Sequence, residues 1–458
     1  MRAVLALAPR LRRVGDRSGG RRPTVTPTTL AVLAFAVTTA LALSVLGGLF
    51  GFIGRAAEPV PAGAPNETSF YVVLAWTAVV LLVVPLAALG GAAARLGVSR
   101  RDARLATLRL LGVTPREVVA LTVVETAVQG LVGAAIGVVG YGALLPLWTR
   151  IPFQGRTFGA AELWVGWLPL GLTLLVVPLL AAVSGAASLR RVVVSPLGVA
   201  RRTTPPGMRW VRALAVVVAV VVFMVLANVA GMLGPGIAVL VLLGSLGAVF
   251  GTLNLVGPWT LGVVGRLMAR WARRPATLLA ARRLLDDPRG AWRVVGGLGL
   301  ASFVAGVLSV LPSLVTADTA GDPAGELLVQ DLLTGGILTL AIAFVLAATS
   351  AGIASAAGVL DRRREYALQQ LAGVPAELFD AVRRRETLVP LVFVVGTSVL
   401  VAWAVLVPLV GAAGVLQPAG LAMIAGCLVV GIALFLAATE ASRPLLRSVL
   451  RETVVRPD

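Results

Sequence analysis

Arginine and carboxylate side chains are the main groups in this sequence that could do chemistry, because histidine and lysine are both absent. All 40 basic residues are arginine, against 21 acidic residues, and the single cysteine, Cys427, lies in an apolar run. A phosphate-binding loop of the form GxxxxGK[ST] requires lysine, while Ser-His-Asp triads and His/Cys zinc sites require histidine. We therefore expect no catalytic residue, metal or cofactor here, and any energy source to be a partner or an ion gradient.

The charged side chains concentrate in two similar passages of the sequence. One reads LLGVTPREVVALTVVET from residue 110, and the other reads LAGVPAELFDAVRRRET from residue 371. Overlaying them without a gap aligns Gly112 with Gly373 and Glu125 with Glu386, at an offset of 261 positions. Apolar matches arise easily between membrane segments, but a Gly-Val pair and a Glu-Thr pair at equal spacing are harder to obtain by chance. We therefore predict an internal duplication.

Each passage predicts a short cytoplasmic helix, a turn and a new membrane-spanning helix. Between residues 100 and 111, Arg101 and Arg104 lie on one side of the expected helix and leucines lie on another. Gly112 suits the end of that helix, and the Thr-Pro-Arg-Glu sequence from residue 114 suits the start of the next. The second copy has the same order of features, ending at Gly373.

Two functions fit these short helices. Basic amphipathic helices often lie under lipid headgroups, so binding to membrane lipids is one interpretation. The other is docking of a cytoplasmic partner, used twice because the partner is twofold. Since attraction to lipid does not require a matched Gly-Val turn and glutamate, the duplication favours docking.

Glu125 and Glu386 raise the hypothesis of a proton relay, because ionisable groups inside membranes are usually functional. More than 20 largely uncharged residues follow each glutamate, which places both near the cytoplasmic boundary of the membrane. We expect each carboxylate to pair with arginine from the neighbouring short helix, in a structural or coupling role.

Composition indicates that membrane helices position these passages. The 458 residues are 58% hydrophobic and 13% charged, with a mean hydropathy of +0.94, whereas soluble domains are about 25% charged. Apolar runs of about 20 residues suffice to cross a bilayer as helices. We predict an all-α polytopic membrane protein with ten spans: 28–54, 70–94, 117–147, 163–187, 212–232, 236–262, 294–317, 332–358, 387–413 and 420–440.

The distribution of charge predicts the orientation of these spans, since arginine favours cytoplasmic loops. With the N-terminus inside, the outer loops hold only Arg55, Arg150 and Arg156, which leaves 37 of the 40 arginines inside. We predict a plasma-membrane protein with both termini cytoplasmic, whose net charge of +19 attracts anionic lipid rather than nucleic acid. The outer side holds the acidic residues Glu58, Glu67, Glu162, Asp318, Asp322, Glu326 and Asp331.

Six spans separate equivalent points of the two copies, so the copies have the same orientation and form a parallel repeat. The predicted division begins with a basic cytoplasmic segment, 1–27, and a first half, 28–200, holding spans one to four. Residues 201–290 form a transmembrane hairpin of spans five and six with a basic cytoplasmic segment, and 291–458 form the second half.

The passage RRDARLATLRLLGVTPREVVALTVVET, followed by a glycine-rich span, resembles the FtsX-like permease domain of MacB/FtsX/LolC-type ABC transporters. DRRREYALQQLAGVPAELFDAVRRRET resembles the same motif again, and two such domains around a hairpin are similar to the ten-span arrangement of BceB-type permeases. The resemblance implies that a separate cytoplasmic ABC ATPase, as a dimer, drives the spans by mechanotransmission. It assigns to two ATPase-coupling helices Arg101, Asp102, Arg104, Leu108, Arg109 and Gly112, and Arg362, Arg363, Arg364, Glu365, Leu368 and Gly373.

The outer loops depart from that family. MacB- and FtsX-type members carry a large outer domain after the first span, and BceB-type members carry one between spans seven and eight. The corresponding loops here, 55–69 and 318–331, are too short for a folded receptor. We therefore expect export or extraction of a hydrophobic compound, peptide or lipid. The alternatives are an ion-coupled secondary transporter and a non-transporting membrane regulator driven by an ATPase.

Overall fold

The protein is an all-α membrane protein, as its composition predicts. A computed structural model describes residues 26–58, 68–95, 115–193, 211–230, 235–310, 323–441 and 443. Within these residues, nine helices are long and apolar enough to cross a membrane. A further helix, α7 (Val211–Ala230), occupies the position of the predicted fifth span and contains the shorter apolar segment Val217–Leu226.

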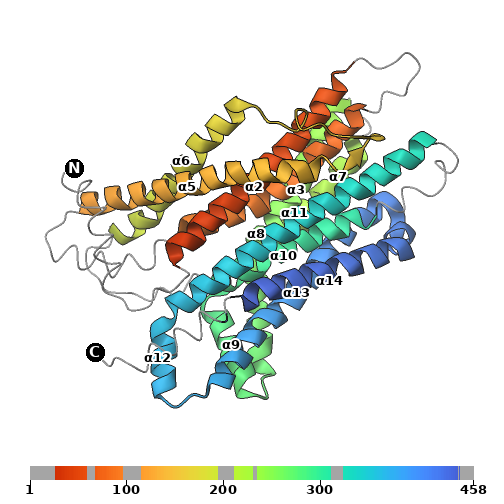
Figure 1. The fold of residues 1–458 in the computed structure, drawn as a ribbon. Coiled ribbons are helices and arrows are strands. Elements are labelled where there is room, and N and C mark those ends of the chain that lie inside the picture. The colour runs from red at the N-terminus through yellow and green to blue at the C-terminus, as the bar shows by residue number, and fades with distance from the viewer. Residues whose placement is uncertain are drawn as a thin grey trace.

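The helices follow one another as two groups of four, separated by a pair (Figure 1). The first group is α2 (Pro27–Ala56), α3 (Thr68–Arg95), α5 (Pro115–Trp148) and α6 (Trp167–Val193). The pair is α7 and α8 (Pro235–Arg270). The second group is α10 (Pro288–Leu308), α11 (Pro323–Asp361), α13 (Ala376–Val415) and α14 (Pro418–Glu440).

Three smaller elements complete the described chain. A two-stranded antiparallel hairpin of β1 (Pro152–Phe153) and β2 (Arg156–Thr157) connects α5 to α6. Helix α9 (Pro275–Asp286) follows α8, and helix α12 (Arg363–Leu371) joins α11 to α13. Figure 1 shows α9 and α12 together at the bottom of the view, beyond the long helices.

Proline begins many of these helices, because a helix's first residue needs no backbone N–H donor. Helix α2 shows how such a start is stabilised. The backbone N–H of Thr29 donates to Thr26 Oγ1 at 3.2 Å, and the backbone N–H of Thr26 donates to Thr29 Oγ1 at 2.9 Å. This reciprocal capping satisfies donors that would otherwise lack partners at the helix end. Pro115 likewise begins α5, where the sequence predicts a new helix.

Several helix ends differ from the predicted spans, and α10 and α13 provide two examples. Helix α10 ends at Leu308, whereas we predicted a span reaching 317. Helix α13 begins at Ala376, whereas the predicted span begins at 387. Hydropathy locates only the apolar part of a helix. In α13, charged turns come before the apolar part and are also helical, so the helix begins earlier than the predicted span. The backbone of α13 is interrupted near its other end, where Gly411 has a φ of 73°.

The first and third helices of each group pack together at equivalent positions. Gly133 and Gly137 of α5 receive the side chains of Phe35 and Thr39 on α2. The positions 261 residues later, Val394 and Ser398 of α13, pack against Gly299 of α10. Small residues allow such close approach of membrane helices. The first and third helices therefore form a tight contact in both halves. The glycines lie on the third helix, α5, in the first half and on the first helix, α10, in the second half.

The fourth helices pack differently in the two halves. Helix α6 lies along α5, where Gly130 faces Ala181, whereas α14 lies along α11, where Gly352 faces Ala438. Helix α13 contacts α9 and the α7–α8 pair instead. The α2–α5 and α10–α13 contacts support the predicted duplication, and the placement of α14 departs from it. The duplication and the domain boundaries stay predictions.

One apolar core extends across both halves, because α3 packs against α11, α8 and α10. Within it, the indole N–H of Trp292 on α10 donates to Asn254 Oδ1 on α8 at 2.8 Å. Asn254 is thus a hydrogen-bonding group between helices, as polar residues in membrane bundles commonly are.

Candidate functional site

Two regions of the structure have features that could serve a function. One is the cluster of α9, α12 and the first turns of α13, which we call the inner foot. The other is a cavity at the opposite end of the bundle, between the two halves.

Helix α12 of the inner foot ends in a defined backbone turn. Gly373 adopts a φ of 83°, which favours glycine because other residues crowd their own backbone there. Its N–H donates to the carbonyl of Gln370 at 2.9 Å, and the N–H of Val374 donates to the carbonyl of Gln369 at 3.1 Å. These two hydrogen bonds together form a Schellman cap. The glycine cap that the sequence predicts is therefore present in the second copy.

Glu386 of α13 holds the start of α12 in place. Arg362, immediately before α12, donates to Glu386 Oε1 at 3.0 Å. Arg283 of α9 lies on the other carboxylate oxygen, with 3.7 Å between Nη1 and Oε2. Burial lowers the pKa of Arg362, but the charge and hydrogen bond of Glu386 outweigh it and raise that pKa above its ordinary value. The expected pairing of Glu386 with an arginine beside the short helix is present.

The inward side of α12 packs against its neighbours. The buried ring of Tyr366 meets Phe379 of α13 edge to face, with 5.7 Å between ring centroids. The guanidinium of Arg283 lies 5.5 Å from the Tyr366 ring and donates to Gln369 Oε1 at 3.3 Å. Farther along, Ala280 of α9 packs against α13. These contacts join the three helices of the inner foot into one unit.

The opposite side of α12 is exposed and partly apolar. Leu368 and Leu371 are 59% and 76% exposed, and Glu365 is exposed beside them. No residue of the described chain covers these leucines. The helix begins at Arg363 and Arg364. An apolar tip beside charged residues is a surface that a protein partner can bury.

The equivalent helix of the first copy falls outside the described residues. This applies to Arg101, Asp102, Arg104, Leu108, Arg109 and Gly112. Glu125, however, is described and half-buried on α5, ten residues after that helix begins at Pro115. Glu386 lies at the same distance from Ala376 at the start of α13. The two glutamates therefore occupy matching places on their helices.

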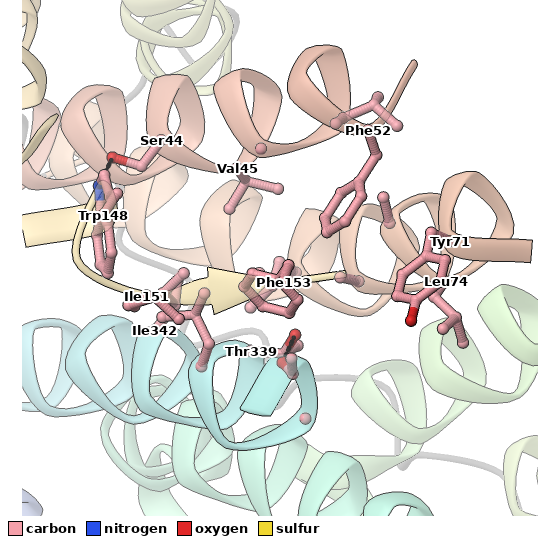
Figure 2. Close-up of a pocket in the computed structure, with 18 of the residues that line it drawn as sticks. Ser44, Val45, Phe52, Tyr71, Leu74, Trp148, Ile151, Phe153, Thr339 and Ile342 are labelled. Carbon is pink, nitrogen blue, oxygen red and sulfur yellow. Dashed lines mark hydrogen bonds between the residues drawn. The ribbon is translucent and has the colours of Figure 1, made fainter. Parts of the chain in front are cut away.

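At the other end of the bundle, a cavity of about 190 Å³ lies between the first half and α11. Its walls come from α2, α3, α5, the β-hairpin and the segment that follows it, the end of α10 and α11, and they are mainly apolar and aromatic. Figure 2 shows Phe52, Tyr71 and Phe153 gathered on one side of it, with Thr339 and Ile342 of α11 opposite. A dry cavity of about 150 Å³ can hold benzene, so this one has room for a somewhat larger apolar group.

Arg55, at the end of α2, fixes the hairpin that closes this cavity. Its side chain is almost fully buried and donates to the carbonyl oxygens of Phe153 at 2.8 Å and Thr157 at 2.9 Å. It also pairs with Glu162 at 3.1 Å, and its guanidinium lies 3.6 Å from the centre of the Phe158 ring. A planar guanidinium can serve several acceptors at once, which an ammonium cannot do in the same geometry.

Asp331 of α11 is the acidic residue of the cavity wall and is only 7% exposed. The hydroxyl of Tyr71 on α3 and the backbone N–H of Gln154 in the hairpin both donate to its Oδ2, each at 2.7 Å. Asp331 therefore ties the second half to the first. The sequence placed Arg55, Glu162 and Asp331 only among the outer charges. An arginine on the side that arginine avoids was the available signal.

Comparison with known proteins bears on the first half of the chain. Residues 76–197 match the protein family described as FtsX-like permease C-terminal. The match runs from within α3, through α5 and the β-hairpin, to just beyond the end of α6. The comparison with curated proteins found no match for the chain.

Proposed function

From the match of residues 76–197 to the FtsX-like permease C-terminal family, we propose that this chain is the membrane subunit of an ABC-type transporter. It couples ATP hydrolysis by a separate cytoplasmic ATPase dimer to export or extraction of a hydrophobic compound, peptide or lipid. The family match supports a membrane component of this type. The ATPase, the substrate class and the mechanotransmission mechanism are parts of the proposal.

The inner foot is the observation that carries this proposal. Its short helix presents Leu368 and Leu371 away from the bundle, where they have no partner in the described chain. Its other side is fixed to α9 and α13 by the Glu386 ion pairs and the Tyr366 ring. A surface that is both exposed and rigidly mounted is suited to transmit force from a bound protein.

Movement of the foot has a direct route into the membrane. Helix α13 begins in the foot and crosses the bundle, packing closely along α10. Helix α11 leads from the foot to Asp331 and the outer cavity. A partner that binds the foot differently in its ATP-bound and ATP-free states shifts the balance between two arrangements of these helices, since only differential binding can do so.

Both halves lie in one chain, so we propose one copy of this protein over two ATPase subunits. The second-copy contact uses Arg362, Arg363, Arg364, Glu365 and Leu368, and the first-copy contact uses the passage around Arg101 and Leu108. Membrane lipids surround the spans, whose exposed surfaces are rich in leucine and valine.

Co-purification with the ATPase tests the proposal. Replacing Leu368 and Leu371 by glutamate should reduce retention of the ATPase about tenfold or more, because truncating or charging a buried interface anchor costs about 2 kcal/mol or more. Charge reversal at Arg101 and Arg363 should act in the same direction. Membrane insertion should be unchanged in all of these variants.

Leu416→Glu is the matched control, because Leu416 is 56% exposed in the turn between α13 and α14, at the opposite end of the bundle. It should leave retention of the ATPase at the wild-type level. Full retention by the α12 variants, or equal loss in the Leu416 variant, would contradict docking at the inner foot.

A further inference from the structure

The outer cavity contains one polar oxygen without a partner in the described chain. Of the two oxygens of Asp331, Oδ2 receives the Tyr71 and Gln154 donors, and no donor in the described residues reaches Oδ1. The other polar side chains of the wall have their own partners. The hydroxyls of Ser44, Thr77 and Thr339 donate to backbone carbonyls of their own helices, Tyr141 donates to the carbonyl of Leu163, and Trp148 donates to Ser44.

Within the described residues, the carboxylate of Asp331 also has no cationic partner. Among the described residues no arginine lies within ion-pair distance of it, and Arg55, which donates to the hairpin from the end of α2, is paired with Glu162. The segments 59–67 and 311–322, which lie outside the described residues, contain no arginine or lysine in their sequence. A buried carboxylate is costly unless it is paired. Asp331 thus combines near-complete burial, a place on a cavity wall and an unused acceptor.

The surrounding charge favours a positive ligand. Of the three arginines expected on the outer side, Arg55 pairs with Glu162 and Arg156 pairs with Glu58 at 2.7 Å. The sequence places seven acidic residues on this side, against these three arginines. An excess of one sign of charge around a cavity raises the local concentration of ions of the other sign.

We propose that this cavity binds an apolar ligand that carries a protonated amine, with the ammonium group on Asp331 Oδ1 and the apolar body among Phe52, Phe153 and Ile342. The aromatic wall also suits a cation, since ring faces attract positive charge. Tyr71 and Gln154 hold the carboxylate in position through its other oxygen. The inference rests on the proposed function only in regarding this lipophilic amine as the substrate class.

Binding of matched naphthyl probes tests this assignment without any ATPase. 1-Naphthylmethylamine is a cation, 1-naphthylmethanol is its neutral analogue, and 1-naphthylacetic acid is an anion. Equilibrium dialysis against the full chain in lipid nanodiscs, with empty nanodiscs as the blank for partitioning, should give the amine about tenfold higher affinity than the alcohol, because charged hydrogen bonds are stronger than neutral ones. The acid should bind more weakly than either.

Variants locate the preference. Asp331→Asn should abolish the preference for the amine while changing binding of the alcohol by less than about threefold, since an amide still accepts from Tyr71 and Gln154. Gly335→Leu should weaken the binding of both the amine and the alcohol, because the introduced leucine side chain would enter the cavity beside Phe153. Glu326→Gln is the matched control, because it removes an exposed negative charge from the same helix and should leave the preference intact.

Equal affinity of the wild-type chain for amine and alcohol would overturn the proposal, and this comparison needs no variant. Survival of the amine preference in Asp331→Asn would also overturn it. Because the binding assay omits the ATPase, its failure leaves docking at the inner foot untouched. Conversely, a variant that loses ATPase retention but still binds the amine would show that amine binding in the cavity does not depend on docking at the inner foot.

Discussion

Arg55 and Arg156 form two arginine–glutamate pairs at the same end of the molecule, and their surroundings differ. The side chain of Arg55 is 2% exposed and satisfies two backbone carbonyls in addition to Glu162. The Arg156–Glu58 pair is about half exposed on both sides. Solvent screens an exposed pair, whereas a buried guanidinium that is removed leaves its acceptors unsatisfied.

Replacing Arg55 by alanine should therefore lower the free energy of unfolding by about 2–4 kcal/mol. Arg156→Ala is the control at the same end and should cost about 1 kcal/mol or less. Unfolding in detergent micelles with increasing denaturant measures both. Equal losses for the two variants would show that the hairpin does not depend on Arg55.

The sequence allowed one of the residue contacts to be predicted and not the others. Glu386 was expected to pair with an arginine near the short helix, because the apolar residues that follow it place it at the predicted cytoplasmic boundary beside that helix, and Arg362 provides the partner. The bonds from Tyr71 and Gln154 to Asp331 join residues 260 and 177 positions apart. Charge pattern predicts which side of the membrane such residues occupy, but tertiary packing decides which of them meet.

At the scale of helices, hydropathy located every span whose helix the structure describes, because the apolar length needed to cross a bilayer is a strong constraint. It could not reveal that α13 starts at Ala376 or that α14 packs on α11 rather than on α13. The first depends on charged turns that remain helical outside the apolar run. The second depends on which face of α13 is already occupied by α9 and the α7–α8 pair.

The contact between α2 and α5 offers a test at this scale. A Cβ atom on Gly137 would lie 2.5 Å from Thr39 Cβ and 2.7 Å from the carbonyl oxygen of Ala36, so the backbone of α2 must move. Gly137→Ala should cost about 1–3 kcal/mol of unfolding free energy, as overpacking does. Gly142→Ala on the same helix meets nothing within 4 Å and should be neutral or slightly stabilising.

Gly137→Ala and Gly142→Ala are the same substitution on the same helix, so the two variants differ only in whether the new methyl group meets a neighbouring helix. Thermal unfolding of both variants in the same detergent is sufficient to rank them. If Gly137→Ala unfolds at the wild-type temperature, the two helices are not in the close contact that the structure shows.

At the scale of the whole molecule, three features lie along connected helices. The inner foot, the α10–α13 contact and the outer cavity are joined by α11 and α13 (Figure 1). The membrane architecture and the match of residues 76–197 to the FtsX-like permease C-terminal family are observations. The docking of an ATPase and the movement it drives are proposals that depend on α12 being a contact surface.

Site-directed crosslinking tests that central point most directly. A Cys427→Ala background removes the single native cysteine, and a thiol-to-amine crosslinker then reports contacts of one introduced cysteine. Because the chain contains no lysine, crosslinks to lysine must come from a partner. We predict that Leu368→Cys forms a product with the ATPase in the assembled complex and that Leu416→Cys does not. Absence of the Leu368→Cys product from an intact complex, or an equal product from Leu416→Cys, would contradict the account.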